Sequence, residues 1–471
     1  MSGLGKKYNI LKAASWYTVG NILVKGVSFF VLPIFTDLMS TTEYGIYSVY
    51  LSYVTIFEVI ILLGLSSTVR IAKFDKDVDF KKYMSTIICI PVLLTLLGML
   101  IINGRFLIVN SNLLSMNLTL WNYLLVTCAF AAVAGIIGAQ LVIESKYKSY
   151  MAYSCINTLL NVGISLFLCY TIYRDHDIHM ARVIGQCASS VISCLFLLFI
   201  TRSKPVITGV YFRQSLRWGI PLLFHTLATI ILTQSDRIVI KYMDGYSAAG
   251  IYSIAVTLIM IPLTLHTSIE NAWAPWFYKK LEEKNYKEAY KINNLYIIAF
   301  AFITGCFMIV SPEIIRLFTN KDFWDSMYCL VPLSISVFGE MLYCLPANIE
   351  YFNKKTTFIM WGTISATIVN IILDIGFVFI FGYVGAAYAT SLSKLLLFAF
   401  HYFLSKKIEH NSVFNNTVAI CSIIVLWLVN FGTITMIEHM LIRWGVLFFF
   451  CTIVAVYCLI KKNSIMEHFK S

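Results

Sequence analysis

Residues 43–50 read EYGIYSVY, and residues 248–255 read AAGIYSIA. The shared tetrapeptide GIYS is short, so its meaning depends on the sequence around it. A second pair of segments supports the first: ESKYKSYMAYSCINTLLN at residues 144–161 aligns with NKKTTFIMWGTISATIVN at residues 353–370. Each of these segments leads from a basic loop into an apolar stretch that carries an asparagine, Asn161 or Asn370. The repeats predict a chain built from two similar halves.

The composition indicates an integral membrane protein. Of the 471 residues, 59% are hydrophobic and 13% are charged, whereas soluble domains carry about 25% charged residues. A membrane-spanning helix needs roughly 20 mostly apolar residues, because lipid offers the backbone no hydrogen-bond partner. We predict fourteen such helices, at residues 14–36, 44–69, 83–102, 118–143, 149–173, 178–200, 219–240, 247–269, 293–311, 327–350, 356–381, 383–404, 414–435 and 443–460.

The two GIYS copies lie at the starts of the second and eighth predicted helices, so six helices separate them. Because six is even, both halves enter the membrane from the same side, as in transporters built from parallel repeats. We expect an N-terminal lobe at residues 1–210, a C-terminal lobe at residues 211–410, and two further helices with a cytoplasmic tail at residues 411–471. Gly45 and Gly250 are expected to permit close packing or a turn at the external edge.

The net charge of +12 does not require a nucleic-acid partner. Most of the 36 Lys and Arg residues fall in segments that become cytoplasmic if the N-terminus is cytoplasmic, which is the positive-inside pattern. We therefore expect both termini in the cytoplasm. The cytoplasmic stretch at residues 273–292 is interpreted as an amphipathic helix at the membrane surface.

Sequence motifs of catalysis and metal binding are absent. The chain has no G-x-x-x-x-G-K-[ST], H-E-x-x-H or G-x-S-x-G motif. Its twelve cysteines include no C-x-x-C pair and are interpreted as small buried hydrophobes. The longest predicted loop is also short for holding an acceptor substrate. We predict a protein that is not an enzyme and has neither a cofactor nor a metal site.

Polar residues recur every three or four positions in many predicted helices, so each set lies on one helix face. We expect these faces to line a wet central cavity, with candidate lining residues Asn21, Asn161, Gln186, Thr229, Thr233 and Asn370. The alternative is that such side chains join helices through interhelical hydrogen bonds. The nearly apolar third, ninth, thirteenth and fourteenth helices are expected to face lipid.

Five ionisable residues lie near the middle of predicted helices: Lys25, Glu58, Glu340, Asp374 and Lys394. A charge at the bilayer centre costs at least ~2.5–3.5 kcal/mol, so it usually faces a cavity or a partner. Each is a candidate functional residue, and the rival interpretation is a structural ion pair such as Lys25 with Glu58. Arg182 and the pair Asp236 and Arg237 lie nearer the external edge, where a structural role is favoured.

Two stretches, LPIFTDLMSTTEYGIYSVY at residues 32–50 and QSDRIVIKYMDGYSAAGIYSIA at residues 234–255, carry a family resemblance. They resemble the signature regions of bacterial polysaccharide transporters, the Wzx-type oligosaccharide flippases of the multidrug/oligosaccharidyl-lipid/polysaccharide (MOP) superfamily. The resemblance covers nearly the whole chain. It implies an all-α, V-shaped bundle like that of MATE transporters, with two six-helix lobes that open alternately to the two sides of the membrane.

The resemblance also implies a substrate, an undecaprenyl (polyprenyl) pyrophosphate-linked oligosaccharide. This lipid would move from the inner to the outer leaflet of the bacterial cytoplasmic membrane for O-antigen, capsule or exopolysaccharide synthesis. Polysaccharide polymerase and chain-length proteins would be partners. Lys25, Lys394 and Arg182 match the cations with which the family lines its cavity, and would bind the pyrophosphate or an acidic sugar.

Two further sets of residues take roles from the resemblance. Asp236 and Arg237 match a recurrent Asp-Arg pair, for which we expect a structural or gating role. Glu58, Glu340 and Asp374 are candidates for coupling transport to H+ or Na+, because a buried carboxyl group can exchange such an ion as access alternates.

Three other functions stay open. A drug/cation antiporter of the related multidrug branch would share the architecture, although a pair of lysines in mid-membrane is a poor host for cations. A membrane scaffold would tolerate loss of the buried charges. A membrane-embedded polysaccharide polymerase or ligase is the remaining alternative.

Overall fold

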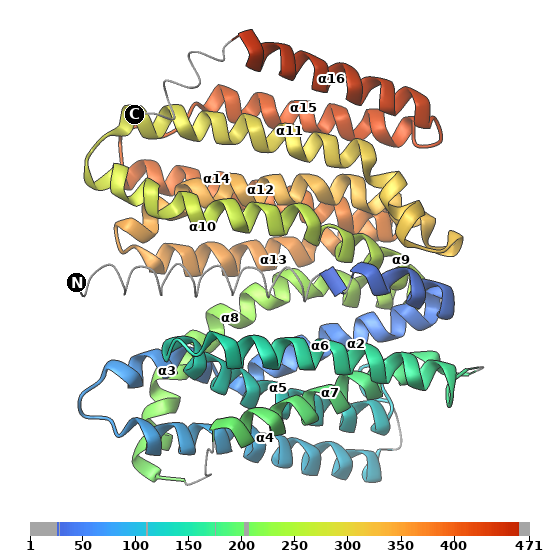
Figure 1. The fold of residues 1–471 in the computed structure, drawn as a ribbon, viewed down its shortest axis with the longest axis vertical. Helices are drawn as coiled ribbons and strands as arrows, with labels where there is room; N and C mark the ends of the chain where they lie inside the picture. Colours follow the sequence, from blue (N-terminus) through green and yellow to red (C-terminus); the bar gives the residue numbers. More distant parts are fainter. Residues whose placement is uncertain (1–25, 28, 110–111, 175, 202–206, 461–471) are drawn as a thin grey trace. The chain divides into compact units, whose positions relative to one another are not determined.

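The computed structural model describes residues 26–27, 29–109, 112–174, 176–201 and 207–460, and these residues are almost entirely helical with no strand (Figure 1). This confirms the all-α class. The helices are α2 (Thr41–Leu62), α3 (Leu65–Phe74), α4 (Phe80–Ile108), α5 (Leu118–Ile143), α6 (Tyr147–Tyr170), α7 (Ile178–Thr201), α8 (Gly209–Met243), α9 (Gly245–Leu258), α10 (Met260–Glu282), α11 (Tyr286–Phe318), the short 3-10 helix η1 (Lys321–Ser326), α12 (Met327–Phe352), α13 (Thr356–Phe381), α14 (Tyr383–Ile408), α15 (Asn416–Thr435) and α16 (Met440–Ile460).

Among the described residues, 11 helical segments are long and apolar enough to span a membrane, or 12 if the two parts of α8 form one span. The predicted count of fourteen is not confirmed. The first predicted span, residues 14–36, lies mostly outside the described residues, and its described part belongs to a shorter apolar helix, Phe29–Leu38. The last predicted span falls on α16, whose part Met440–Thr452 is apolar but too short by itself to count as a span. The count of fourteen therefore stays a prediction.

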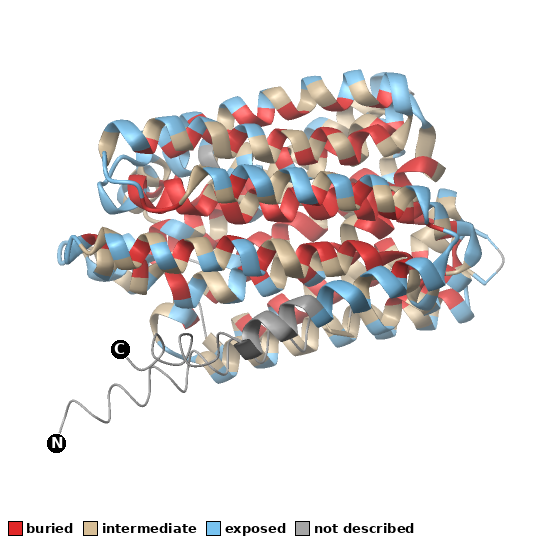
Figure 2. Ribbon diagram, turned by 90° about the horizontal axis from the view of Figure 1, so that it is seen from above, coloured by how far each residue is buried: buried red, intermediate tan, exposed pale blue. Residues whose placement is uncertain are grey.

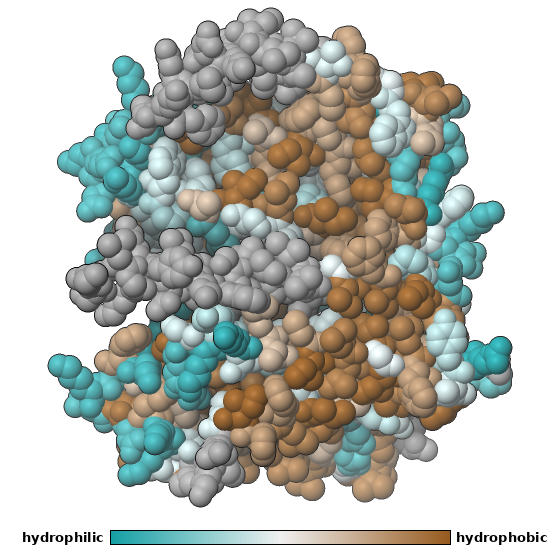
Figure 3. Space-filling model, in the orientation of Figure 1, coloured by the Kyte–Doolittle hydropathy of each residue, from teal (hydrophilic) through white to brown (hydrophobic). Residues whose placement is uncertain are grey.

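The surface of each unit is apolar along the helices. Figure 3 shows brown, hydrophobic surface over the middle parts of the helices and teal, hydrophilic residues near the helix ends. On α4, for example, Leu93, Leu96, Leu97 and Leu100 are 47–73% exposed. Four exposed leucines within eight residues of one helix are expected on a surface that faces lipid and not on one that faces water. The chain is a multi-pass membrane protein.

Short polar loops begin several of the helices. The side chains of Ser40, Asp79, Asn117 and Asn285 each accept a hydrogen bond from a backbone N–H in the first turn of the helix that follows. These bonds satisfy N–H groups that the helix itself leaves without a partner. The polar residues between the apolar runs therefore define where these helices begin.

Contacts between Cα atoms divide the chain into two compact units, Met1–Gly250 and Ile251–Ser471. In the first unit, α3, α4, α5 and α7 form a shared hydrophobic core. Helix α8 packs against α2, α3 and α4 of the same unit. Buried residues follow one face of most helices, as the red stripes in Figure 2 show. The largest fully buried core side chains include Leu65, Tyr83, Ile87 and Ile136.

Glycines permit the closest helix contacts of the first unit. A Cβ atom on Gly45 would overlap the backbone of Tyr246, and one on Gly250 would overlap the backbone of Thr41. The start of α2 and the start of α9 therefore meet backbone to backbone. This confirms that the glycines of the two GIYS copies permit close packing.

A second contact of this kind joins the break between α2 and α3 to α8. Leu63 and Gly64 adopt left-handed backbone conformations, with φ values of 49° and 69°. A Cβ atom on Gly64 would overlap the carbonyl oxygen of Gly219, and one on Gly219 would overlap that of Leu63. Helices α2 and α8 are thus in close contact at this break as well as through the hydrogen bond from Ser52 to Gln234 (3.1 Å).

In the second unit, α12 is the central helix. It contacts α10, α11, α13, α14 and α15. Of the most apolar 18-residue stretch in Lys321–Phe352, 83% is buried inside the protein. The neighbouring α13 and α15 are much less buried, since only 28% and 22% of their most apolar 18-residue stretches lie inside the protein. Helix α12 is therefore shielded from both lipid and water over most of its length.

The predicted surface helix at residues 273–292 is wrong. Helix α10 continues without a break to Glu282, and α11 begins at Tyr286. Trp273, Phe277 and Leu281 are buried, so the apolar side of this stretch packs inside the unit. The alternation of apolar and charged residues reflects one buried helix face rather than a face on the membrane surface.

We expect Gly45→Ala to lower the stability of the protein by about 1–3 kcal/mol, because the added methyl group has no room beside the backbone of Tyr246. For a unit of this size the thermal unfolding temperature in detergent should fall by roughly 3–10 °C. Gly163→Ala is the matched control, since a Cβ atom at Gly163 in α6 meets nothing within 4 Å. Equal unfolding temperatures for the two variants would contradict the proposed contact.

Candidate functional site

Polar side chains of the second unit gather where α10, α12 and α14 meet. On α12, Glu340, Cys344 and Asn348 follow one another at intervals of four residues, so they lie on one helix face. Helix α10 presents Glu270 to this region, and α14 presents Lys394. Because α12 is buried on most sides, these polar groups have to find partners within the unit.

The first pair joins α12 to α14. The Lys394 ammonium donates a hydrogen bond to the Glu340 carboxylate, with 2.6 Å between Nζ and Oε2. The two side chains are 17% and 28% exposed. Gly339 brings the helices together beside the pair, since a Cβ atom there would lie 2.9 Å from the Cβ of Lys394. Lys394 and Glu340, which the sequence analysis named as separate candidate residues, thus form one neutral pair.

A second pair lies further along the same two helices. Nδ1 of His401 is 2.9 Å from both carboxylate oxygens of Glu350, and neither side chain is exposed. Gly362 on α13 leaves room for the His401 ring, because a Cβ atom there would overlap it. Because no solvent reaches this contact, removing one partner would leave the other buried without its partner and would destabilise the protein.

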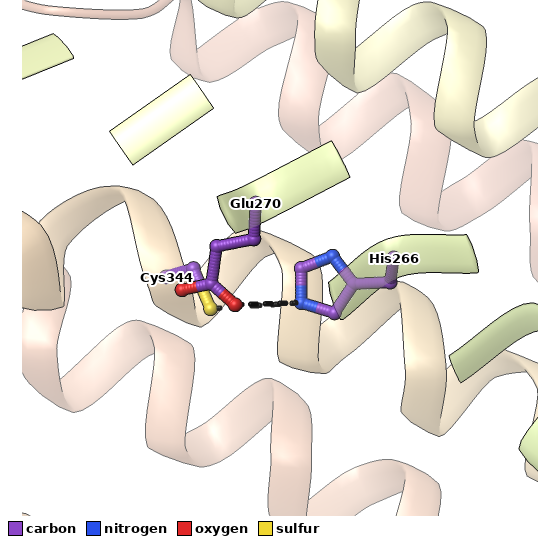
Figure 4. Close-up of side chains that lie close together, drawn as sticks. All are labelled: His266, Glu270 and Cys344. Atoms are coloured by element: carbon purple, nitrogen blue, oxygen red, sulfur yellow. Dashed lines mark hydrogen bonds and ion pairs between the residues drawn. The ribbon is translucent and has the colours of Figure 1, made fainter. Parts of the chain in front are cut away.

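A third group joins α10 to α12. Nε2 of His266 lies 3.7 Å from Oε2 of Glu270 and 3.6 Å from Sγ of Cys344 (Figure 4). Nδ1 of the same ring lies 3.0 Å from the hydroxyl of Tyr296 on α11. His266 and Cys344 are buried, while Glu270 is 30% exposed. An imidazole, a carboxylate and a thiol therefore meet at one point.

A cavity of about 340 Å³ opens beside these groups, within the second unit. The Tyr278 hydroxyl on its wall donates a hydrogen bond to Oδ1 of Asn348. Hydroxyl, amide and carboxylate groups are the partners that sugar hydroxyls need, and the volume is in the usual range for ligand pockets. Its lining residues are Glu270, Tyr278, Glu340, Tyr343, Cys344, Ala347, Asn348 and Tyr351.

Two further cavities have apolar walls, one in each unit. The first, of about 530 Å³, is lined by α4, α5 and α7, with Ile88, Leu96 and Val133 among its residues. The second, of about 360 Å³, is lined by α11, α15 and α16. Walls of this composition suit hydrocarbon chains.

Among the predicted site residues of the first unit, Lys25 and Asn21 lie outside the described residues. The guanidinium of Arg182 stacks on the rings of Phe35 and Tyr47, at 3.6 and 4.3 Å from their centroids. Such cation–π contacts stabilise a charge that has left water. Arg182 therefore joins α7 to the N-terminal helices.

Other predicted polar residues bond to neighbouring helices. Asn161 on α6 donates a hydrogen bond to Gln186 on α7. In the other unit, the amide of Asn370 on α13 donates to Ser393 on α14, at 3.3 Å. At these two positions the structure contains hydrogen bonds between helices, which the sequence analysis gave as the alternative to a wet cavity.

On α8, Asp236 is buried, and Arg237 donates a hydrogen bond of 2.6 Å to Oε1 of Gln234. Arg237 also lies 3.5 Å from Ser52 on α2, so it takes part in the contact between these helices. Thr229 and Thr233, by contrast, are exposed along α8.

The two remaining acidic candidates do not belong to the α10–α12–α14 group. Glu58 on α2 is partly buried, and no described Lys, Arg or His lies within ion-pair distance of it. Its predicted partner, Lys25, lies outside the described residues. Asp374 on α13 is fully buried. Both carboxyl groups stay candidates for ion coupling.

The sequence interpretation missed His266, Glu270, Cys344 and Glu350. Glu270 lies one residue beyond the predicted end of the eighth span at 269, so it was not recognised as a group inside a helix bundle. The spacing of His266 and Glu270, four positions apart on a helix, was the available signal. No sequence pattern pointed to Cys344, because its partners come from another helix.

We expect His401→Ala to destabilise the protein by about 3–5 kcal/mol, because it leaves the Glu350 carboxylate buried without its partner. The double variant His401→Ala/Glu350→Ala should be less destabilised than the sum of the single variants. Thermal unfolding in detergent measures both. Glu438→Ala is the control, since Glu438 pairs with Arg316 while 71% exposed and should change stability by less than about 1 kcal/mol. Additive single effects would contradict the pairing.

Comparisons with known proteins place the chain in a family. A family model described as "Polysaccharide biosynthesis protein" matches residues 10–280, which is more than half of the chain. Two Haemophilus influenzae proteins are similar along nearly their whole length. An "Uncharacterized membrane protein" is 21% identical over 415 residues, 86% of this chain and 98% of the relative. The "Lsg locus putative protein 1" is 21% identical over 416 residues, 85% of this chain and 99% of the relative.

Solved structures show the same fold. A lipid II flippase, MurJ, in an inward closed conformation has a TM-score of 0.68 and 18% identity, covering 95% of this chain and 99% of its own. An inward-facing MATE family multidrug resistance transporter has a TM-score of 0.62 and 13% identity, covering 84% and 98%. The chain thus belongs to the polysaccharide biosynthesis protein family, with the fold of MurJ and of the MATE transporters.

Proposed function

We propose that this protein moves a polyprenyl-pyrophosphate-linked oligosaccharide from the cytoplasmic to the outer leaflet of a bacterial cytoplasmic membrane. The product would feed the synthesis of an O-antigen, a capsule or an exopolysaccharide. Membership in the polysaccharide biosynthesis protein family and the fold shared with a lipid II flippase support the class of substrate. The observation that carries the proposal is the polar cavity between α10 and α12, inside a unit whose outer surface is apolar.

The sugar head group would bind in this cavity. Tyr278, Asn348 and Glu270 offer a hydroxyl, an amide and a carboxylate, which match the donors and acceptors of sugar hydroxyls. These partners also replace the water that the head group loses on entering the protein.

Lys394 is the proposed cation for the pyrophosphate. It is held by Glu340 in the described state, so the phosphate would have to replace that carboxylate as its partner. An exchange between two anions costs less than bringing an unpaired lysine into the bundle. Lys25 is proposed for the same role, while Arg182, stacked on Phe35 and Tyr47, would act through its charge alone.

The polyprenyl tail would lie in the apolar groove between α11, α15 and α16. Its walls include Ile298, Phe302, Val425 and Phe450, which favour a hydrocarbon chain over water. This assigns a role to the two helices that follow the second repeat.

Transport would proceed by alternating access of two lobes, residues 1–210 and 211–410, with the last segment at 411–471 and both termini in the cytoplasm. Glu58 and Asp374 are the proposed carboxylates for coupling to H+ or Na+. Asp236 and Arg237 would act at the contact between α8 and α2. No covalent chemistry is part of this function, and a polymerase and chain-length proteins are the proposed partners.

A drug/cation antiporter is the second candidate, because two carboxylates, Glu270 and Glu340, line the same cavity. An acidic cavity attracts organic cations. Deletion of the gene separates the two functions: an antiporter predicts increased sensitivity to cationic dyes such as ethidium, whereas the flippase predicts loss of surface polysaccharide with unchanged dye sensitivity.

Depletion of the protein should trap lipid-linked oligosaccharide in the inner leaflet. In intact spheroplasts an impermeant sugar-modifying reagent should then fail to label the accumulated lipid, while lysed spheroplasts should be fully labelled. Accumulation of labelled lipid on intact cells would place the missing step in polymerisation or ligation and overturn the proposal. Absence of any accumulated lipid would favour drug efflux or a scaffold.

We expect Lys394→Ala to reduce export at least about tenfold at unchanged protein level, because one phosphate contact of this kind contributes about 1.5–3 kcal/mol. Lys394→Arg keeps the positive charge and should retain most of the export. The double variant Lys394→Ala/Glu340→Ala removes the buried pair without leaving a single charge, so it separates a folding defect from a loss of phosphate binding. Full export by this double variant would contradict the role of Lys394.

A further inference from the structure

His266, Glu270 and Cys344 bring three metal-binding side chains to one point between α10 and α12. Their ligand atoms, an imidazole nitrogen, a carboxylate oxygen and a thiol sulfur, all lie within 4.8 Å of one another. Figure 4 shows the three side chains converging from the two helices. None of the roles derived above for the cavity requires a thiol or an imidazole.

The distances suit a small cation. A tetrahedral zinc ion, with bonds of about 2.0 Å to nitrogen or oxygen and about 2.3 Å to sulfur, separates its ligand atoms by roughly 3.3–3.6 Å. The observed separations from Nε2 of His266 are 3.6 Å to Cys344 and 3.7 Å to Glu270. Shifts of a few tenths of an ångström would complete the coordination on these two edges.

Tyr296 holds the His266 ring in the orientation that a metal ligand needs. Its hydroxyl lies 3.0 Å from Nδ1, and when Nδ1 carries the proton, Nε2 keeps its lone pair toward Glu270 and Cys344. Metal-binding histidines usually have such a partner on the second nitrogen. Phe300 packs edge-on against the same ring, with 5.5 Å between centroids, and further restricts its rotation.

The site also has an entrance and an unbalanced charge. Glu270 and Cys344 line the cavity, and the Glu270 side chain is 30% exposed, whereas His266 is buried. Lys394 is already paired with Glu340. Within the described residues, the ion-pair contact of Glu270 is with His266, so a divalent cation would neutralise a carboxylate that no lysine or arginine neutralises there.

We propose that His266, Glu270 and Cys344 bind a zinc-class divalent cation, with the fourth coordination position open to the cavity. On binding, the Cys344 thiol transfers its proton to solvent and the thiolate takes its place as a ligand. The fourth position would hold a water molecule or a ligand oxygen. Metal binding at this site does not depend on which molecule the protein transports.

The ligand set excludes the common alternatives among cations. Magnesium, calcium and sodium prefer oxygen ligands, whereas a thiolate with an imidazole favours zinc and its softer neighbours. The ligands come from two different helices: His266 and Glu270 lie one turn apart on α10, and Cys344 lies on α12. A bound ion would therefore tie α10 to α12 beside the cavity.

The test uses the full-length protein in detergent, stripped with EDTA and desalted. After addition of Zn²⁺ and removal of the excess, elemental analysis should find about one zinc per chain, and thermal unfolding should shift to higher temperature. Cys344→Ser and His266→Gln should bind zinc at least about tenfold more weakly. Cys329→Ser is the matched control, because Cys329 is buried in the same helix outside the cluster.

Cobalt identifies the thiolate directly. The Co²⁺-loaded wild type and Cys329→Ser should show a thiolate-to-cobalt charge-transfer band in the near ultraviolet, and Cys344→Ser should not. Tyr296→Phe, which removes only the hydroxyl that lies beside Nδ1, should weaken zinc binding roughly tenfold. If Cys344→Ser does not fold, Glu270→Gln serves as the second ligand variant and should likewise weaken zinc binding.

Two outcomes overturn the proposal. One is a wild-type protein that binds substoichiometric zinc without a thermal shift, in which case the cluster is a hydrogen-bonded polar contact. The other is a charge-transfer band that persists in Cys344→Ser, which assigns the metal to another cysteine. Neither result would bear on the transport of lipid-linked oligosaccharide, since the leaflet assay measures that separately.

Discussion

The burial of α12 is the constraint on which the second unit depends. This helix is surrounded by five others, and most of its apolar window is inaccessible to lipid and water. A charged group on such a helix cannot be solvated, so it has to meet its partner inside the protein. Glu340 meets Lys394 and Glu350 meets His401, and both partners come from α14. Glu340 of the first pair also lines the polar cavity.

This compensation changes the expected chemistry of the site. The sequence suggested a cavity lined by cations, but Lys394 is paired with Glu340, and Arg182 is stacked on Phe35 and Tyr47. The walls of the described cavity carry hydroxyl, amide and carboxylate groups instead. A hydrogen-bonding surface of this kind is better suited to a sugar head group than to a simple anion, because sugar hydroxyls both donate and accept hydrogen bonds.

The two repeats retain similar contacts at equivalent positions. Asn161 and Asn370, which align between the halves, each bond to the helix that follows, through Gln186 on α7 and Ser393 on α14. The glycines of the GIYS copies, in contrast, approach each other's helices. The repeated sequence therefore encodes both the internal packing of each half and one contact between α2 and α9. Both depend on residue size and hydrogen bonding, which a short motif can preserve.

The sequence by itself determined the all-α membrane class, the approximate positions of the helices and the family. These follow from apolar runs and contiguous motifs, which are local properties of the chain. The tertiary structure alone decided which polar groups meet. Lys394 and Glu340 lie 54 positions apart, and Cys344 is 78 positions from His266. Such pairs form only when packing brings separate helices together, because periodicity places a residue on a helix face but not opposite a particular neighbour.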